Sequence, residues 1–164
     1  MKLILATLLS ISFISCGIYS FSGKSIPNEA KTISVNYFNN KAATVQPSLS
    51  QVFTERLKDM FLEQTNLDII ENEGDLSFSG YISKYQIKPI AIKANETAGQ
   101  NRLTITVKVT YNNSLDFKNN FENNFSRYRD YDSSQNISDI ENTLIEEITN
   151  ELAEDIFNKA FVNW

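Results

Sequence analysis

Residues 103–111 alternate apolar and polar side chains without a break. Threonines and one lysine separate the apolar members, which are Leu103, Ile105, Val107, Val109 and Tyr111. A period of two places successive side chains on opposite faces of an extended chain. The segment therefore predicts a β-strand in a sheet that has one buried face and one polar face.

Four further segments have the composition and periodicity of strands, namely residues 31–38, 67–70, 76–87 and a final strand within 117–132. The alternation in residues 76–87 changes phase, which predicts a β-bulge near Ser83 and Lys84. Pro89 cannot donate a backbone hydrogen bond, so this end of the strand is expected at a sheet edge or outside the sheet. Residues 39–41 are predicted to form a turn.

Two segments repeat apolar residues every three or four positions, which is typical of amphipathic helices. The first is residues 48–65, with a capping box between Ser48 and Gln51. The second is residues 137–162, with a capping box between Ser138 and Glu141 and an acidic face expected to be solvated. The order β-α-β-β-β-β-α predicts an α+β fold, a two-layer sandwich in which two helices cover one face of a mostly antiparallel sheet of four to five strands.

The N-terminus has the features of an export signal. Lys2 precedes an apolar run over residues 3–14, which is shorter than the roughly 20 residues that a membrane span needs. Cys16, the single cysteine of the chain, follows Ser15 and precedes Gly17, an arrangement that resembles a bacterial lipobox. We expect residues 1–15 to be a lipoprotein signal peptide, 16–30 the lipidated cysteine and a tether, and 31–164 one α+β domain. The alternative is an ordinary signal peptide beside an incidental cysteine.

A lipid anchor at Cys16 predicts where the protein resides. Two or three acyl chains, palmitate among them, hold a protein stably on a bilayer, whereas one chain does not. The residue after Cys16 is Gly17 and not the aspartate that retains many lipoproteins in the inner membrane. We therefore expect an outer-membrane lipoprotein whose domain faces the periplasm.

The composition argues against catalysis and against nucleic acid. The chain has no histidine and one cysteine, which excludes Ser-His-Asp and Cys-His nucleophile systems and cysteine-rich metal sites. It also lacks a P-loop and a GxGxxG motif, so neither an enzyme nor a cofactor is expected. Residues 130–134 resemble a calcium loop but lack the EF-hand spacing and glycine, so no metal site is predicted. A net charge of −5 argues against nucleic-acid binding.

Four basic residues near the middle of the chain are candidate ligand-binding groups: Arg102, Lys108, Arg127 and Arg129. Cations beside an aromatic residue such as Tyr128 can bind a phosphorylated glycolipid through charge-assisted hydrogen bonds and stacking. The alternative is that these residues pair with nearby carboxylates, an arrangement that is common on protein surfaces.

Several stretches, taken together and in order, resemble the LptE family of lipopolysaccharide-assembly lipoproteins. They are CGIYSFSGKSIP at 16–27, KTISVNYF at 31–38, LSQVFTE at 49–55, NRLTITV at 101–107, FSRYRDYD at 125–132, and DIFNKA at 155–160 followed by Asn163 and Trp164. The resemblance implies a two-layer domain without catalysis. It also implies an LptD-type outer-membrane β-barrel as partner, which the protein would plug and help to assemble for lipopolysaccharide export to the cell surface. Some family members bind lipopolysaccharide. A polar strand face suits a barrel lumen, which is itself polar.

A second function from a different class remains open at this point. The chain could be an independent periplasm-facing lipoprotein that binds a glycolipid or a cell-wall ligand without an integral partner. Co-purification with a barrel would separate the two hypotheses.

Overall fold

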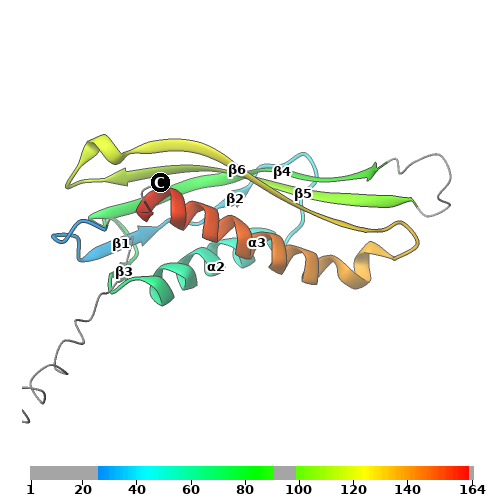
Figure 1. Ribbon diagram of the computed structural model, residues 1–164, viewed down its shortest axis with the longest axis horizontal. Helices are drawn as coiled ribbons and strands as arrows, with labels where there is room; N and C mark the ends of the chain where they lie inside the picture. Colours follow the sequence, from blue (N-terminus) through cyan, green and yellow to red (C-terminus); the bar gives the residue numbers. More distant parts are fainter. Residues whose placement is uncertain (1–25, 91–98, 163–164) are drawn as a thin grey trace, which may run out of the picture.

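The computed structural model describes residues 26–90 and 99–162, which form a twisted sheet with two helices against one of its faces (Figure 1). The predicted two-layer α+β fold is confirmed. In chain order the elements are β1 (Thr32–Val35), β2 (Asn39–Asn40), α2 (Leu49–Gln64), β3 (Asp68–Ile70), β4 (Leu76–Ile90), β5 (Gln100–Asn113), the 3-10 helix η1 (Phe117–Asn119), β6 (Phe121–Asp132) and α3 (Ile137–Phe161). Neither helix of the described part of the chain has both the length and the apolar character needed to cross a membrane.

The sheet is mixed and has six strands, whereas a mostly antiparallel sheet of four to five was predicted. Its order is β3-β1-β4-β5-β6, with β2 beside β4. Strand β1 runs parallel to both β3 and β4, and β2 runs parallel to β4. Helix α2 supplies the crossover that parallel strands β1 and β3 require. Strands β4, β5 and β6 form an antiparallel meander. The predicted turn at residues 39–41 is wrong in part, because Asn39 and Asn40 pair with Tyr81 and Ile82 as β2.

The irregularity predicted in the long strand is present. The β4–β5 register shifts between Ile82 and Lys84, where the phase of the alternation changes. Strands β1 and β2 pair with β4 no further than Ile82. The remaining half of β4 is therefore an edge strand, and Pro89 lies there opposite Asn101. An edge is where a residue without a backbone N–H costs least.

The core lies between the sheet and the helices. All five apolar residues of the alternating segment in β5 are buried, as predicted. At one end of the core, five aromatic rings pack together, with the Phe61 and Phe78 centroids 4.6 Å apart and those of Phe78 and Tyr111 4.7 Å apart. Phe157 and Phe161 of α3 complete this cluster, so the same contacts hold both helices against the sheet.

Both predicted capping boxes are wrong, because side chains other than those of Ser48 and Ser138 accept the hydrogen bonds at the helix N-termini. Ser48 is the N-cap residue of α2, but its side chain makes no capping bond. The Oε1 atom of Gln46 instead accepts from the backbone N–H of Leu49 at 2.9 Å. At α3, Asn136 is the N-cap residue and its side chain accepts from the N–H of Ser138 at 3.2 Å. In each case a polar side chain just before the helix accepts from one of the N–H groups left free in the first turn.

Candidate ligand-binding surfaces

The β5–β6 register places the four candidate basic residues on two opposite faces of the sheet. Residues directly opposite each other in an antiparallel pair share a face. Arg129 lies opposite Leu103 and Arg127 opposite Ile105, both of which are buried beneath the helices. Arg102 lies opposite Asp130 on the outer face, the side of the sheet away from the helices, and Lys108 shares that face. The structure therefore does not bring the four residues together into one basic cluster.

Arg127 and Arg129 connect β6 to α3. Arg129 donates to Glu147 at 2.6 Å and to Glu151 at 2.5 Å. Arg127 makes two bonds of 2.6 Å to the two carboxylate oxygens of Asp155. These hydrogen bonds raise the pKa of both arginines, and the one from Arg129 lowers the pKa of Glu151. The acidic face of α3, predicted to be solvated, is thus partly used to bind the sheet.

Arg102 and Lys108 also have partners on the outer face. Arg102 makes a bidentate pair with Asp130, at 2.7 and 2.8 Å, and its guanidinium lies 3.6 Å from the centre of the Tyr128 ring. The hydrogen bond raises the pKa of Arg102 and lowers the pKa of Asp130. Lys108 lies 2.7 Å from Glu122. All four basic residues therefore pair with nearby carboxylates, as the alternative interpretation predicted.

Two further cations, Lys84 and Lys88, join the outer face and were missed by sequence reasoning. They lie opposite Thr106 and Arg102, and both are exposed. Within residues 26–90 and 99–162, no carboxylate pairs with either lysine. The bulge after Ile82 is what moves Lys84 to this face, because one extra residue inverts the alternation that follows it. The phase change in the sequence could therefore have predicted that Lys84 and Lys88 lie on the outer face.

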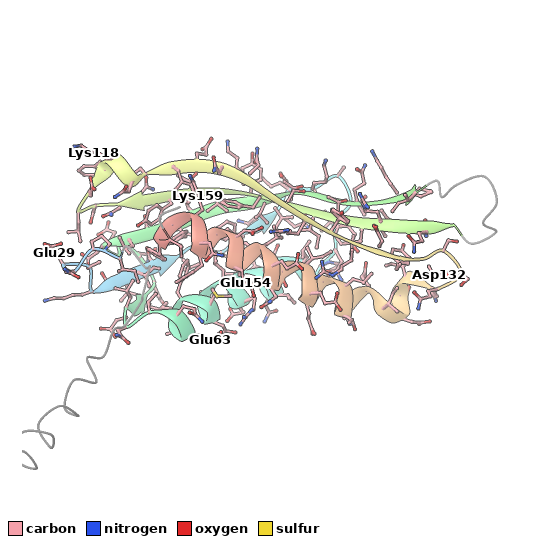
Figure 2. All side chains as sticks on the ribbon, viewed as in Figure 1. Glu29, Glu63, Lys118, Asp132, Glu154 and Lys159 are labelled. Atoms are coloured by element: carbon pink, nitrogen blue, oxygen red, sulfur yellow. The ribbon has the colours of Figure 1, made fainter. Side chains whose placement is uncertain are left out.

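The outer face as a whole is polar and neither helix lies on it (Figure 2). The positions that the register assigns to it on the three long strands are Ser77, Ser79, Tyr81, Lys84, Gln86, Lys88 and Ile90 on β4, Gln100, Arg102, Thr104, Thr106, Lys108, Thr110 and Asn112 on β5, and Glu122, Asn124, Ser126, Tyr128, Asp130 and Asp132 on β6. Hydroxyl pairs such as Thr106 with Ser126, 2.9 Å apart, tie neighbouring strands together on it. This face can therefore contact a polar partner over three strands.

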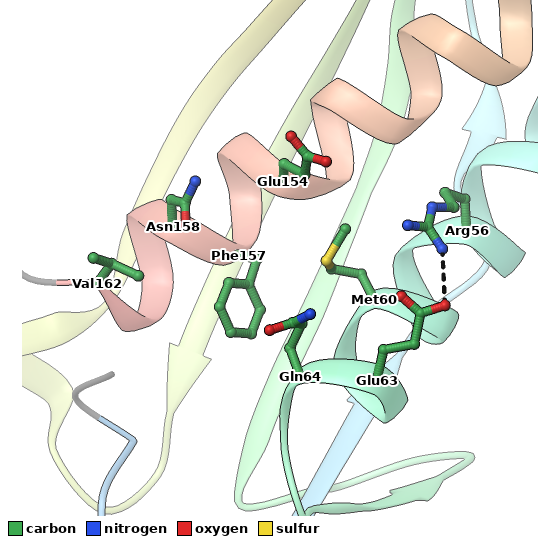
Figure 3. A pocket seen from close by; sticks show the side chains of 8 residues that line it. All are labelled: Arg56, Met60, Glu63, Gln64, Glu154, Phe157, Asn158 and Val162. Atoms are coloured by element: carbon green, nitrogen blue, oxygen red, sulfur yellow. Dashed lines mark hydrogen bonds and ion pairs between the residues drawn. The ribbon is translucent and has the colours of Figure 1, made fainter. Parts of the chain in front are cut away.

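A groove of about 500 Å³ lies between the helices near their C-terminal ends (Figure 3). Met60 and Phe157 supply apolar walls, and the remaining lining residues are Arg56, Glu63, Gln64, Glu154, Asn158 and Val162. Arg56 donates to Asn150 at 2.8 Å and lies 3.2 Å from Glu63, so it bridges the two helices. The Arg56 guanidinium therefore joins α2 to α3, whereas Glu63 and Glu154 each bond within their own helix.

The remaining candidates have structural explanations or lie outside the described residues. The Oδ1 atom of Asp132 accepts from the N–H and hydroxyl of Ser134 at 2.8 and 2.6 Å, which shapes the exit from β6. In the described part of the chain, no three Asp, Glu, His or Cys side chains are grouped so that they could hold a metal ion. Cys16, predicted to carry the lipid, lies outside the described residues.

Comparison with solved structures shows the fold in other bacterial proteins. A minor lipoprotein from Acinetobacter baumannii aligns over 79% of this chain and 91% of its own, with a TM-score of 0.51 and 14% identity. A hypothetical protein from Chlamydia trachomatis aligns over 82% and 99%, with a TM-score of 0.54 and 7% identity. A homologue of neuraminyllactose-binding hemagglutinin from Helicobacter pylori aligns over 86% and 88%, with a TM-score of 0.52 and 9% identity. At these identities the likeness concerns the fold alone.

The family comparison covers most of the domain. No curated protein matches the sequence. The family described as LptE, lipopolysaccharide-assembly, matches residues 30–160, from just before β1 almost to the end of α3. That span includes every strand, α2 and all of α3 except its last residue, so the chain belongs to the LptE family of lipopolysaccharide-assembly proteins.

Proposed function

We propose that this protein is an outer-membrane lipoprotein, anchored through Cys16 and facing the periplasm. It plugs an LptD-type β-barrel and helps that barrel to assemble for lipopolysaccharide export to the cell surface. The family match over residues 30–160 carries the proposal. The polar outer face supports it, because barrel lumens are polar and a plug must present matching groups to the wall.

A role in assembly, without catalysis, agrees with how the charged groups are used. The arginines of β5 and β6 pair with carboxylates of the same sheet or of α3. Such pairs stiffen a small domain and fix the position of its helix. A rigid body with a polar face is what a barrel plug requires.

We further propose that the outer face contacts the phosphate groups of lipopolysaccharide. Lys84 and Lys88 are exposed there beside Arg102, and Lys108 lies on the same face. A cation without a carboxylate partner can bind phosphate without first giving up an ion pair. For Arg127 and Arg129, which were also predicted to bind ligand, contact with phosphate would compete with the carboxylates of α3.

A pull-down of the full-length lipidated protein in mild detergent, followed by mass spectrometry, tests the barrel proposal. The expected result is a large outer-membrane β-barrel recovered in a stoichiometric amount. Recovery of the protein alone would overturn the plug proposal and favour the independent binding module for a glycolipid or cell-wall ligand.

Paired lysine substitutions test the lipopolysaccharide contact. Lys84→Ser with Lys88→Ser should weaken binding of purified lipopolysaccharide, and more at low salt than at high salt, because salt screens exposed charges. Lys58→Ser with Lys159→Ser removes the same charge from the two helices and should leave binding unchanged. Equal losses in the two double variants would contradict a specific contact on the outer face.

A further inference from the structure

The tip of the β5–β6 hairpin, residues 114–120, holds two apolar side chains in solvent. Phe117 is 74% exposed, more than any other large apolar side chain in the described part of the chain, and Leu115 is 45% exposed. Lone exposed apolar residues are common on protein surfaces. Two of them on one short tip would gain free energy from contact with an apolar partner, because each is costly to keep in water.

The tip is built to hold these side chains outward. The buried Asn113 side chain accepts from the backbone N–H groups of Leu115 and Asp116 at 2.9 and 3.0 Å. Asp116 in turn accepts from the N–H of Lys118 at 3.2 Å and from the side chain of Asn119 at 2.9 Å. These bonds fix the backbone of η1 on both sides of Phe117. Its exposure therefore follows from a defined turn.

The tip lies at the end of the domain where the N-terminal segment enters. Ser114 donates from its N–H and its hydroxyl to the backbone oxygen of Asp75, both at 2.9 Å. The carboxylate of the same Asp75 accepts from the N–H groups of Lys31 at 2.9 Å and of Thr32, the first residue of β1, at 3.0 Å. One residue thus joins the base of the tip to the first strand of the domain. Figure 2 shows Glu29 and Lys118 at the same end of the long axis, with Asp132 at the other.

The distance to the expected lipid anchor is short. Nine residues lie between Cys16 and Ile26, where the described chain begins, so ten residue steps join the two. Ten residues span at most about 35 Å when fully extended. A lipid on Cys16 would therefore hold this end of the domain close to the bilayer surface, within reach of the tip.

We propose that Leu115 and Phe117 insert into the membrane interface and give the protein a second contact with the bilayer. This inference rests on the proposed lipid anchor at Cys16. Because the anchor already holds the protein on the bilayer, the tip binds lipid at a high effective concentration. Two apolar side chains then suffice, although they could not hold the protein on a membrane without the anchor. Lys118, exposed beside Phe117, can extend its ammonium toward lipid headgroups.

Depth-dependent quenching tests the insertion. Phe117→Cys, labelled with an environment-sensitive fluorophore, is made in the full-length lipidated protein, in which acylation blocks Cys16. The protein is placed in phosphatidylethanolamine and phosphatidylglycerol vesicles that carry nitroxide groups at shallow or deep acyl positions. Insertion to about 5–10 Å predicts strong quenching, more from the shallow group than from the deep one. Leu115→Cys provides a second labelled position if the first variant folds poorly.

Gln135→Cys is the matched control, because Gln135 is exposed and its N–H donates to the backbone oxygen of Asp132 at 3.0 Å. Figure 2 shows Asp132 at the opposite end of the domain from Lys118 of the tip. The label at position 135 should show no quenching. If position 117 in the acylated protein is quenched no more than position 135, the tip does not enter lipid and the proposal fails. A protein surface of the barrel would then be its partner.

The test separates failure of the tip from failure of the anchor. Incorporation of labelled palmitate reports on Cys16 independently of the fluorophore. If the chain is not acylated, Cys16→Ser removes the thiol that would otherwise also take the fluorophore. An N-terminal hexahistidine tag on this variant, bound to a nickel-chelating lipid, can then replace the anchor, since the chain has no histidine of its own. Quenching at position 117 on that tether would support the tip while the proposed anchor fails, and its absence would overturn both.

Discussion

The hydroxyl of Tyr85 donates a hydrogen bond to the Oε1 atom of Glu141 and so joins the edge half of β4 to the first turns of α3. The Tyr85 side chain is buried, and β1 and β2 do not reach this part of the sheet. Tyr85→Phe should lower the free energy of unfolding by about 1–2 kcal/mol, because a bond to a charged group is lost. Urea titration measures this. Tyr128→Phe, at an exposed tyrosine on the outer face, should change stability little, and equal losses would contradict the role of the Tyr85 bond.

Alkaline pH should weaken the same contact. Burial, and then the bond to Glu141, raise the pKa of Tyr85, and burial raises the pKa of Tyr111 to about 12. The usual pKa of tyrosine is near 10, and a folded-state pKa above this value means that the neutral hydroxyl stabilises the fold. This stabilisation is complete below about pH 10 and is lost as the pH rises further. The free energy of unfolding should therefore fall above about pH 10. The fall should be smaller in Tyr85→Phe, and identical falls would refute the assignment.

Gly80 is expected to tolerate no side chain. Its φ is +156°, and a Cβ atom there would lie 1.9 Å from the carbonyl oxygen of Lys108 and 2.7 Å from the Phe38 ring. Backbone cannot move aside as a flexible side chain can, so Gly80→Ala should cost about 3 kcal/mol or more. Gly99→Ala is the control, because its Cβ would meet nothing closer than the Ser133 hydroxyl at 3.2 Å. Thermal melts of the two variants should differ widely, and similar melting temperatures would exclude the predicted clash.

Periodicity predicted the parts of the fold that depend on burial. The alternation in β5 and the phase change before Lys84 depend on which face is apolar, and both appear in the structure. Strand direction leaves no such pattern, so the parallel pairing of β1 and the short β2 were not foreseen. The division of Arg102 from Arg129 follows from pairing register. That register depends on contacts between strands, so it could not be predicted from the spacing of the basic residues along the sequence.

Acid should weaken the junction around Asp75. Its carboxylate accepts from the N–H groups of Lys31 and Thr32 at 2.9 and 3.0 Å, and from the Thr32 hydroxyl at 3.0 Å. These bonds lower the pKa of Asp75, those from the two backbone groups most strongly. A carboxylate whose pKa is lower in the folded state stabilises the fold. This stabilisation is present above the pKa of the unfolded chain, near 4, and is lost as the pH falls.

The neutral variant Asp75→Asn should therefore be less stable than the native chain at pH 7, and this difference should shrink below about pH 4. Chemical unfolding across this pH range measures it. Asp68→Asn, at an exposed aspartate in β3, removes the same charge and should not reproduce the effect. A difference that is constant with pH would show that the charge of Asp75 is not what stabilises the junction.

The bridge from Arg129 to Glu151 decides whether this arginine is available to a ligand. A double-mutant cycle with Arg129→Met and Glu151→Gln should give a coupling of about 1 kcal/mol or less, because both side chains are only partly buried. The coupling should decrease at high salt. Arg129→Met should then weaken one link between β6 and α3 and reduce lipopolysaccharide binding only as far as it reduces stability. A coupling near zero, together with lost binding in a fully stable Arg129→Met variant, would instead place Arg129 in the ligand site and move that site to the helix side of the sheet.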